Sequence, residues 1–474
     1  MDNAVPSTAR RGGPSAAARG LGTVAVVLAL TLTAPGVAQA VGPPQVDPHA
    51  LVLGAPVAPP EPTQQRLVCA HPVWTGPAQS GEPAAQRELA LTQAWQFSRG
   101  AGQLVAVIDT GVNRHPRLSV VSGGDYVSNS DGTADCDGHG TLVSGIIAAH
   151  PAPDGSDRFS GVAPEAAILS IRQTSLAYSA ANSADDKRPG QMSTGGFGTV
   201  NTLAYAIVHA IDMHATVINI SEVSCTAAGQ NPSDGALGAA LKYAADRDVV
   251  VVAAAGNLES QGACKTQNGA GWDGVKTIAS PAWFAPNVLS VGSVEPDGAP
   301  STFTLHGPWV GVAAPGSNLM SLDSSPGGTG LVNGIPEAEG KTAAINGTSF
   351  SSAFVSGVAA LVRARYPGLP AAQVIERIVR TAHAPGDGRD DSIGAGLVDP
   401  VAALTADLPA RSYAPDRAGR AIAAPRPEPR VNPWPRRIGI GGALTCLILL
   451  AIVQAVSIPL RSRHHMPLDL PGGD

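Results

Sequence analysis

Short apolar runs recur through the middle of the chain and alternate with segments of helical pattern. Residues 104–108 contain no polar side chain, as is typical of a strand that is buried on both faces of a sheet. Four similar runs follow, at 167–171, 217–220, 249–253 and 288–291. Between them lie segments of helical pattern, at 141–149, 199–213 and 235–246. This alternation predicts an α/β domain of three layers, in which helices cover both faces of a mostly parallel central sheet.

Another apolar stretch lies near the start of the chain. Residues 24–30 follow three arginines and precede Ala38-Gln39-Ala40, so a positive start, a short apolar centre and a small-residue cleavage site succeed one another. This order predicts a secretory signal peptide at residues 1–40. The alternative is an uncleaved N-terminal anchor.

Near the other end, residues 438–460 are almost wholly apolar. At about 1.5 Å per residue, a helix of this length spans a hydrocarbon core of about 30 Å. The stretch predicts one C-terminal transmembrane helix, and the alternative is a buried helix of a globular domain. Because a signal peptide directs export of the domain behind it, we expect the main domain on the extracytoplasmic side of the cell membrane. Residues 461–474 would then form a cytoplasmic tail.

Composition divides the exported part further. Residues 41–92 are Pro-rich and lack a sustained period, which predicts an extended N-terminal segment held by surface contacts. The α/β pattern occupies residues 93–405, and the Pro- and Arg-rich stretch 406–437 is typical of a tether. Within the α/β part, residues 178–199 lack a period and predict an exposed loop.

Charge and cysteine content limit the possible functions. The net charge is −6 and no basic cluster occurs, so we expect no nucleic-acid partner. No zinc-ligand spacing or acidic cluster appears either, and we expect no metal or other cofactor. Four cysteines lie in the exported part, where disulfides persist, and they allow three pairings that spacing does not distinguish. Cys446, in the predicted membrane helix, is expected to be a free thiol.

Three short motifs follow a predicted strand or begin a predicted helix. They are Asp109-Thr110-Gly111, Gly138-His139-Gly140-Thr141 and Gly347-Thr348-Ser349. Taken singly, Asp109 could be a turn residue or the nucleophile of an aspartic protease. His139 could be a packed histidine or one that caps a helix, and Ser349 could be a helix N-cap. The aspartic-protease alternative lacks a second Asp-Thr/Ser-Gly motif. Together, the order Asp, His, Ser is that of the subtilisin catalytic triad and differs from the chymotrypsin and α/β-hydrolase orders.

The chemistry of peptide hydrolysis explains why these residue types occur together. A serine hydroxyl is a weak nucleophile at neutral pH, so a neutral imidazole has to accept its proton. His139 can do this, and Asp109 would orient the ring and stabilise the imidazolium that forms. Ser349 at a helix N-terminus lies where the helix dipole favours negative charge. Asn257, shortly after the run at 249–253, can donate to the oxyanion, the alternative being an ordinary turn residue.

With these motifs the chain resembles the subtilisin-like proteases over residues 93–404. Among them it is similar to the mycosins, the membrane-anchored subtilases of actinobacterial type VII secretion systems. The similarity is carried by 217–221 (VINIS) with Cys225, 306–316 (HGPWVGVAAPG) and 345–350 (INGTSF), and by the order of segments along the chain. The resemblance implies the disulfides Cys69–Cys136 and Cys225–Cys264. It also implies an N-terminal extension that wraps the catalytic domain and is not removed.

The resemblance further implies a cleft in which a substrate binds as an added strand. The residues expected to contact the substrate are Ile220, Ser221, Glu222, Ala254, Ala255 and Gly256. Where subtilisins have Ser-Leu-Gly at the first specificity pocket, this chain has Ser221-Glu222-Val223. Val223 would crowd the rim of that pocket and Glu222 adds a charge, so we expect a narrow specificity.

The sequence supports two functions. The first is an endopeptidase that cleaves a narrow set of secreted proteins in type VII secretion. The second is a mainly structural component of the type VII secretion membrane complex, with protease activity secondary. Both include the subunits of that complex as partners. The intact triad and Asn257 favour catalysis, whereas the loop at 178–199 and the membrane helix favour docking.

Overall fold

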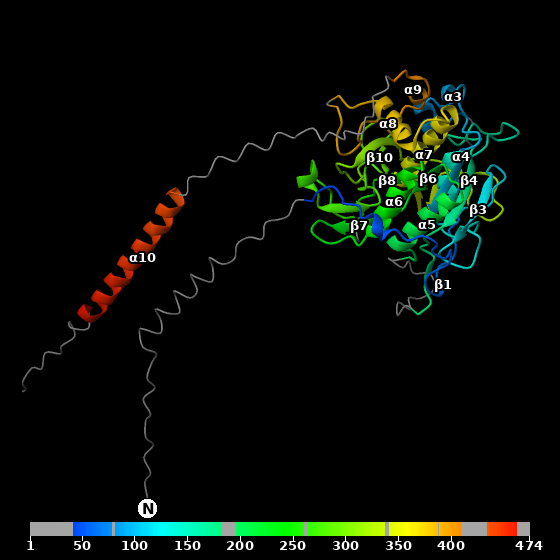
Figure 1. Ribbon diagram of the computed structural model, residues 1–474. Helices are drawn as coiled ribbons and strands as arrows, with labels where there is room; N and C mark the ends of the chain where they lie inside the picture. The colour runs from blue at the N-terminus through cyan, green and yellow to red at the C-terminus, as the bar shows by residue number, and fades with distance from the viewer. Residues whose placement is uncertain are drawn as a thin grey trace, which may run out of the picture. The chain divides into compact units, whose positions relative to one another are not determined.

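The computed structural model describes residues 41–77, 81–182, 196–259, 263–336, 341–386, 388–408 and 434–461 (Figure 1). The chain divides into two compact units, Met1–Asp407 and Leu408–Asp474. The predicted signal peptide, most of the predicted tether and nearly all of the predicted tail lie outside the described residues.

A seven-stranded sheet forms the centre of the first unit, and all its neighbouring strands pair in parallel. The strand order is β11-β10-β8-β6-β2-β4-β3. The strands are β2 (Leu104–Asp109), β3 (Val120–Asp125), β4 (Ala167–Arg172), β6 (Val217–Ile220), β8 (Val250–Ala254), β10 (Leu289–Val294) and β11 (Val310–Pro315). Strands β2, β4, β6, β8 and β10 coincide with the apolar runs in the sequence. The prediction of a mostly parallel sheet is confirmed.

The sequence did not reveal the two edge strands. The first three residues of strand β3 are exposed or half-buried, and Gly123 and Gly124 follow them, so the strand has no apolar run. Strand β11 reads Val-Gly-Val-Ala-Ala-Pro, in which small residues and a proline obscure the β-branched pattern.

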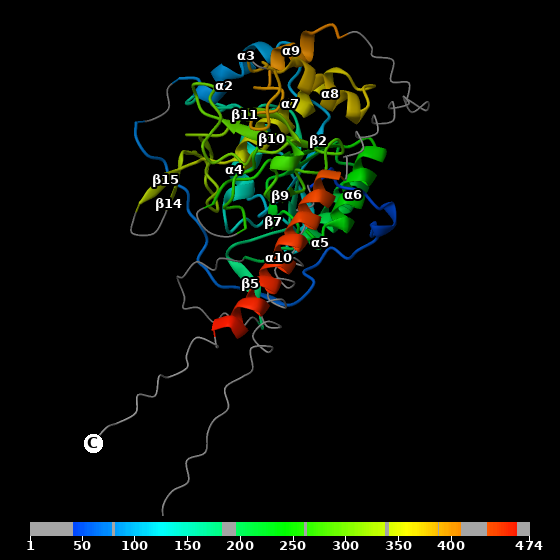
Figure 2. The same cartoon turned by 90° about the vertical axis from the view of Figure 1, so that its left-hand side faces the viewer.

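Helices cover both faces of the sheet (Figures 1 and 2). The helices that pack on it include α4 (His139–Ala148), α5 (Val200–Asp212), α6 (Gly235–Asp246) and α7 (Thr348–Arg365). Val105 and Val107 of β2 belong to the core that includes α4 and α7, whereas Ala106 and Ile108 belong to the core that includes α5 and α6. Alternate residues of one strand thus enter separate cores, as the pleat requires. The three-layer prediction is confirmed.

The N-terminal extension lies against the rest of the first unit. Its strand β1 (Thr63–Gln65) pairs antiparallel with β5 (Tyr178–Ala180), and Val73 bridges to Gly334. Residues 178–180 are therefore a strand, which corrects the expectation of a loop throughout 178–199. The pairing with β5 holds the Pro-rich extension in a defined conformation, although the sequence of the extension has no strand pattern of its own. Residues 183–195 lie outside the described residues.

The remaining described elements of the first unit are helix α8, which has 11 residues, and several shorter helices and strands. They are η1 (Pro48–Ala50), α2 (Ala84–Glu88), α3 (Leu91–Ala94), β7 (Ser224–Ala227), η2 (Trp272–Gly274), β9 (Thr277–Ser280), β12 (Ser321–Leu322), β13 (Leu331–Val332), β14 (Gly334–Pro336), β15 (Thr342–Ala344), α8 (Ala371–Thr381) and α9 (Pro400–Thr405).

Helix α10 (Trp434–Arg461) belongs to the second unit and contains the apolar stretch 438–460. Its large apolar side chains between residues 444 and 453 are exposed. Within the part of the chain that the structure describes, no helix combines the length and hydropathy needed to cross a membrane.

Candidate active site

The three predicted triad residues come from elements that meet at the carboxyl edge of the sheet. Asp109 ends β2, His139 begins α4, and Ser349 is the second residue of α7. Open parallel sheets bind their ligands beyond the carboxyl ends of the strands. The fold thus brings His139 next to residues that are 30 and 210 positions away in the sequence.

His139 bridges the other two side chains. Its Nδ1 lies 2.7 Å from Oδ1 of Asp109, and its Nε2 lies 3.0 Å from Oγ of Ser349. The side chain of Asp109 is fully buried, whereas that of His139 is 26% exposed. A nucleophile bonded to a base, and a base oriented by a carboxylate, is the arrangement that activates a serine.

The environment of His139 favours its protonated form. Burial lowers the pKa of His139, but the charge of Asp109 and the hydrogen bond with its carboxylate act in the opposite direction and prevail. Glu222 and Asp135 add to the upward shift. The pKa therefore lies above the ordinary value of a histidine, and the imidazole is a stronger base than it would be in water.

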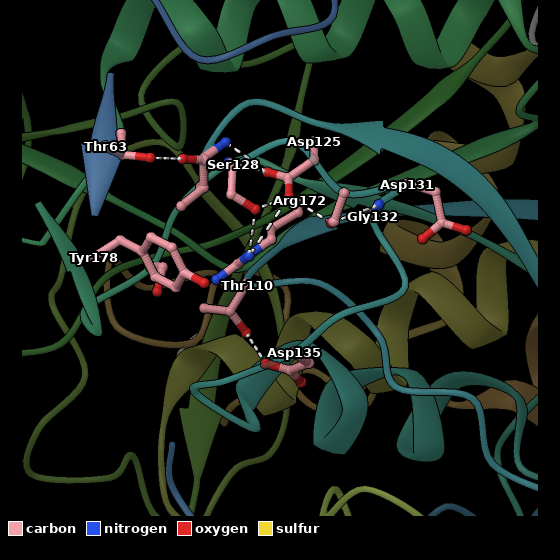
Figure 3. A network of polar contacts seen from close by, with 12 residues as sticks. Thr63, Thr110, Asp125, Ser128, Asp131, Gly132, Asp135, Arg172 and Tyr178 are labelled. Carbon is pink, nitrogen blue, oxygen red and sulfur yellow. Dashed lines mark hydrogen bonds and ion pairs between the residues drawn. The ribbon is translucent and has the colours of Figure 1, made fainter. Parts of the chain in front are cut away.

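A buried carboxylate that the sequence reasoning missed, Asp135, joins the turn after β2 to the start of α4 (Figure 3). Its carboxylate accepts hydrogen bonds from Thr110 Oγ1 at 2.9 Å and from Gly138 N at 2.7 Å. It also accepts from N and Oγ1 of Thr141, at 2.9 and 2.6 Å. Because the N-cap Gly138 has no side chain, Asp135 caps this helix in its place. Burial raises the pKa of Asp135 to about 6, although these hydrogen bonds act in the opposite direction.

The two turns pack so closely that residue 140 has to be glycine. A Cβ atom on Gly140 would lie 2.1 Å from the carbonyl oxygen of Gly111 and 3.2 Å from Oδ1 of Asp109. The glycine that follows the histidine in the sequence motif is therefore a packing requirement of the site.

Asn257 lies beside the nucleophile, with its amide fixed by Thr348. Its Oδ1 accepts hydrogen bonds from N and Oγ1 of Thr348, at 3.0 and 2.9 Å. Its Nδ2 and the Oγ of Ser349 both lie against Gly347, at 3.4 and 3.0 Å from the position of a Cβ atom there. The N–H of Ser349 belongs to the first turn of α7, where backbone donors lack intrahelical partners. Two donors therefore lie next to the serine hydroxyl.

The predicted substrate-contacting residues lie at and just beyond the carboxyl ends of two neighbouring strands. Ile220 ends β6 and Ala254 ends β8, and these strands pair in parallel. Residues 221–223 belong to no strand, so their backbone is available to an added peptide strand. Ala255 and Gly256 both donate their N–H groups within the protein, the latter to the Thr348 hydroxyl.

The space beside Gly256 is narrow. Gly256 has a φ of 106°, and a Cβ atom there would lie 3.3 Å from Cδ2 of Leu305 and 3.5 Å from Cγ1 of Val223. Val223 and Leu305 thus line the gap between the two substrate-contacting segments.

Glu222 lies closer to the triad than its place in the sequence indicated. One oxygen each of Glu222 and Asp109 and a ring nitrogen of His139 lie within 4.8 Å of one another. Burial and the charge of Asp109 raise the pKa of Glu222 to about 7, against the effect of His139. Carboxylates and imidazole can bind zinc, but here the imidazole and Asp109 are hydrogen-bonded to each other.

A second polar network, also without a sequence motif, lies beside the end of β2 (Figure 3). Arg172 is 1% exposed, and its Nη1 lies 3.5 Å from Oδ2 of Asp125 and 3.2 Å from Oγ of Ser128. The ring centroid of Tyr178 lies 4.5 Å from the guanidinium. Thr63 of the extension donates to a carbonyl of the loop after β3, so the extension reaches the same region.

Two disulfides join segments around the site. They are Cys69–Cys136 and Cys225–Cys264, the same two pairs that the resemblance implies. The first joins the extension to the loop before His139. Cys446 is a free cysteine.

Comparisons with known proteins agree with this geometry. The model of the subtilase family matches residues 100–396. Mycosin-4 of Mycobacterium tuberculosis is 48% identical over 438 residues, covering 90% of this chain and 93% of the relative. Mycosin-3 of the same organism is 43% identical over 444 residues, covering 90% of this chain and 95% of the relative.

Solved structures give the same result. The MycP3 protease from the type VII (ESX-3) secretion system is 45% identical, with a TM-score of 0.71 over 77% of this chain and 100% of that one. A chain in the structure of an intact ESX-5 inner membrane complex is 39% identical, with a TM-score of 0.72 over 88% of this chain and 100% of that one. The chain belongs to the subtilase family of serine proteases and, within it, to the mycosins.

Proposed function

We propose that this protein is a membrane-anchored serine endopeptidase that cleaves a narrow set of exported proteins in type VII secretion. Asp109, His139 and Ser349 form its catalytic triad. The observation that carries the proposal is the pair of hydrogen bonds, 2.7 and 3.0 Å long, by which His139 joins the other two residues. A scaffold without catalytic activity has no physical need for this arrangement of carboxylate, imidazole and hydroxyl groups.

The geometry supports hydrolysis through an acyl-enzyme. Ser349 Oγ attacks the scissile carbonyl carbon while His139 Nε2 accepts the hydroxyl proton. The tetrahedral intermediate expels the amine, which takes that proton from His139, and an ester remains on Ser349. Water then attacks the ester with His139 again as the base, which releases the carboxylic product and restores the hydroxyl. Asp109 holds the orientation of the His139 ring and stabilises the imidazolium in both halves of the reaction.

We assign the oxyanion site to the N–H of Ser349 and Nδ2 of Asn257. Both donors lie where negative charge develops on the carbonyl oxygen, and the start of α7 contributes its dipole. The two hydrogen bonds from Thr348 hold the Asn257 amide with its oxygen away from the oxyanion. Such preorganisation matters because a fixed donor does not have to reorient during the reaction.

The narrow gap beside Gly256 supports a restricted specificity. A side chain immediately before the scissile bond would enter this gap, where Val223 and Leu305 limit its size. We expect small side chains to be accepted there and aromatic ones to be rejected.

The site of action is inferred from the sequence and from the relatives. The relatives of known structure come from an ESX-3 secretion system and an ESX-5 inner membrane complex, so we place this protein with the subunits of a type VII secretion membrane complex. The predicted signal peptide at 1–40 and the apolar stretch at 438–460 support a single-pass anchor with the protease outside the cytoplasm. Disulfides persist in that compartment.

A second candidate function is mainly structural, as a subunit that stabilises the secretion complex. It is favoured by the match to a chain of the ESX-5 complex over 88% of this protein.

One experiment tests both functions. Cells that lack the protein are complemented with wild type, S349A or the control S156A, which makes the same change at an exposed position. We expect substrate processing with wild type and S156A and none with S349A. Processing by S349A would contradict the proposed function. Secretion that persists with S349A but fails without the protein would establish the structural role.

A further inference from the structure

Glu222 is a carboxylate in the cleft that the mechanism above does not use. It follows β6, is half-buried, and lies within 4.8 Å of groups on Asp109 and His139. Over the described ranges of the chain, no Lys or Arg forms an ion pair with Glu222 and no donor forms a hydrogen bond with its carboxylate. A carboxylate in such a position normally has a partner.

Negative charge is in excess around Glu222. One oxygen of the buried Asp109 accepts no hydrogen bond from any residue that the structure describes. Burial raises the pKa of Glu222, and the charges of Asp109 and Asp137 raise it further, while His139 acts in the opposite direction. A cation placed beside Glu222 would relieve this repulsion and favour the ionised carboxylate.

A cavity of about 310 Å³ opens beside Glu222, and this volume lies within the size range of ligand pockets. Its wall comes from the end of β4, the start of α5 and the segment after β6. Glu222 is the one charged residue among the described residues that line it, and Val200 and Leu203 add apolar surface. The wall is more polar than apolar, and its apolar part together with the Glu222 carboxylate fits a long side chain with an apolar stem and a positive charge at its tip.

The register of a bound peptide decides which of its side chains reaches this cavity. Side chains alternate along an extended segment, and Val223 contacts the space beside Gly256. Both residues border the cavity, but the Glu222 carboxylate extends toward His139. In a substrate paired with residues 221–223, the side chain before the scissile bond would face Val223 and the second one before it would face Glu222.

We propose that Glu222 makes the protease prefer Lys or Arg as the second residue before the scissile bond. The methylene stem would lie in the 310 Å³ cavity and the charged end at the Glu222 carboxylate. This inference deepens the proposed function and depends on it, because it requires cleavage at Ser349. Together with the narrow gap beside Gly256, it predicts a preferred substrate that has a small residue immediately before the scissile bond and a basic residue before that one.

The test uses the full-length protein and three internally quenched peptides that differ only at the second residue before the scissile bond, which is Lys, norleucine or Glu. We expect wild type to cleave the Lys peptide with a kcat/KM about tenfold above that of the norleucine peptide, which corresponds to about 1.4 kcal/mol. In E222Q the ratio should fall to about one, and E222K should prefer the Glu peptide. The advantage of Lys should shrink in high salt, which screens the charges.

Glu165 provides the matched control. It lies before the start of β4, at the opposite edge of the sheet, with its side chain 50% exposed. E165Q removes the same charge as E222Q and should keep the wild-type preference for Lys.

Reaction of Ser349 with a fluorophosphonate separates the two ways in which the test can fail. If wild type is labelled and cleaves peptides without a preference for Lys, or if E222Q keeps the preference, this inference is overturned and the proposed function stands. If wild type is neither labelled nor active on any of the three peptides, both are overturned.

Discussion

At the scale of single residues, the protonation of His139 sets the pH range of activity. The attack on the substrate requires the neutral imidazole. Burial lowers the pKa of His139, but Asp109 more than compensates, with Glu222 and Asp135 in the same direction. We therefore predict that kcat/KM rises with pH through a midpoint above 6.5, the ordinary value for a histidine.

Glu222→Gln removes one of the carboxylates that raise this pKa, so the midpoint should move to lower pH. Profiles of kcat/KM against pH, measured with the norleucine peptide, check both statements. A wild-type midpoint at or below 6.5, or an upward shift in E222Q, would contradict this view of the site.

Asn257 gives a second prediction at this scale. Asn257→Ala should lower kcat by about 10²–10³, as expected when one oxyanion donor is lost, with little change in KM. Thr348→Val removes only one of the two bonds that fix the amide, so its loss should be smaller. Steady-state kinetics on one peptide measure both variants. A change of only a few-fold in N257A would mean that its amide does not reach the oxyanion.

The sequence contained the triad residues but not their surroundings. Asp109, His139, Ser349 and Asn257 stand in motifs whose order is informative. Asp135 has no motif, and the sequence predicts Glu222 only as a substrate-contacting residue, because the proximity of both to the triad arises from contacts between segments that are far apart in the chain. The position of Glu222 near His139 depends on how β6 ends relative to α4, and only the folded structure gives that.

At the scale of elements, one hydroxyl joins the turn after β2 to the start of α4. Thr110 Oγ1 donates to Asp135 and accepts from the N–H of Gly140, at 2.9 Å in both cases. Thr110→Val keeps the shape but leaves the buried N–H of Gly140 without its partner and removes one of the four hydrogen bonds that Asp135 accepts. We predict a loss of about 1–3 kcal/mol in the free energy of unfolding, together with reduced kcat.

Denaturant unfolding and steady-state kinetics of T110V provide the measurement. Thr133→Val is the control, since Thr133 is only half-buried and, among the residues that the structure describes, it hydrogen-bonds only to the neighbouring Asp131. If T110V were as stable and active as T133V, the two turns would not be coupled through this hydroxyl.

Sequence pattern predicted the interior of the sheet better than its edges. Strands β2, β4, β6, β8 and β10 are buried on both faces, so each one consists mainly of apolar residues. The edge strand β3 meets solvent, and the small residues of β11 give a weaker pattern. The pairing of β1 with β5 could not be read from either segment, because neither has a strand pattern of its own.

At the scale of the whole molecule, the Cys69–Cys136 disulfide attaches the extension next to the active site. It closes a sequence separation of 67 residues. Replacing both cysteines by serine should lower the free energy of unfolding by about 2–4 kcal/mol and expose the extension to proteases.

We also predict that the mature protein keeps its extension. Mass spectrometry of the isolated protein should find an N-terminus near residue 41, and an N-terminus near residue 93 would count against a permanent extension.

The proposed protease depends above all on Ser349 being a nucleophile that His139 and Asp109 activate. This can be tested by treating the full-length protein with a fluorophosphonate and locating the adduct by mass spectrometry. We predict one adduct, on Ser349, whose rate of formation falls strongly in H139A and which is absent in S349A. Wild type that does not react, or that reacts equally well without His139, would show that Ser349 is not activated in this way.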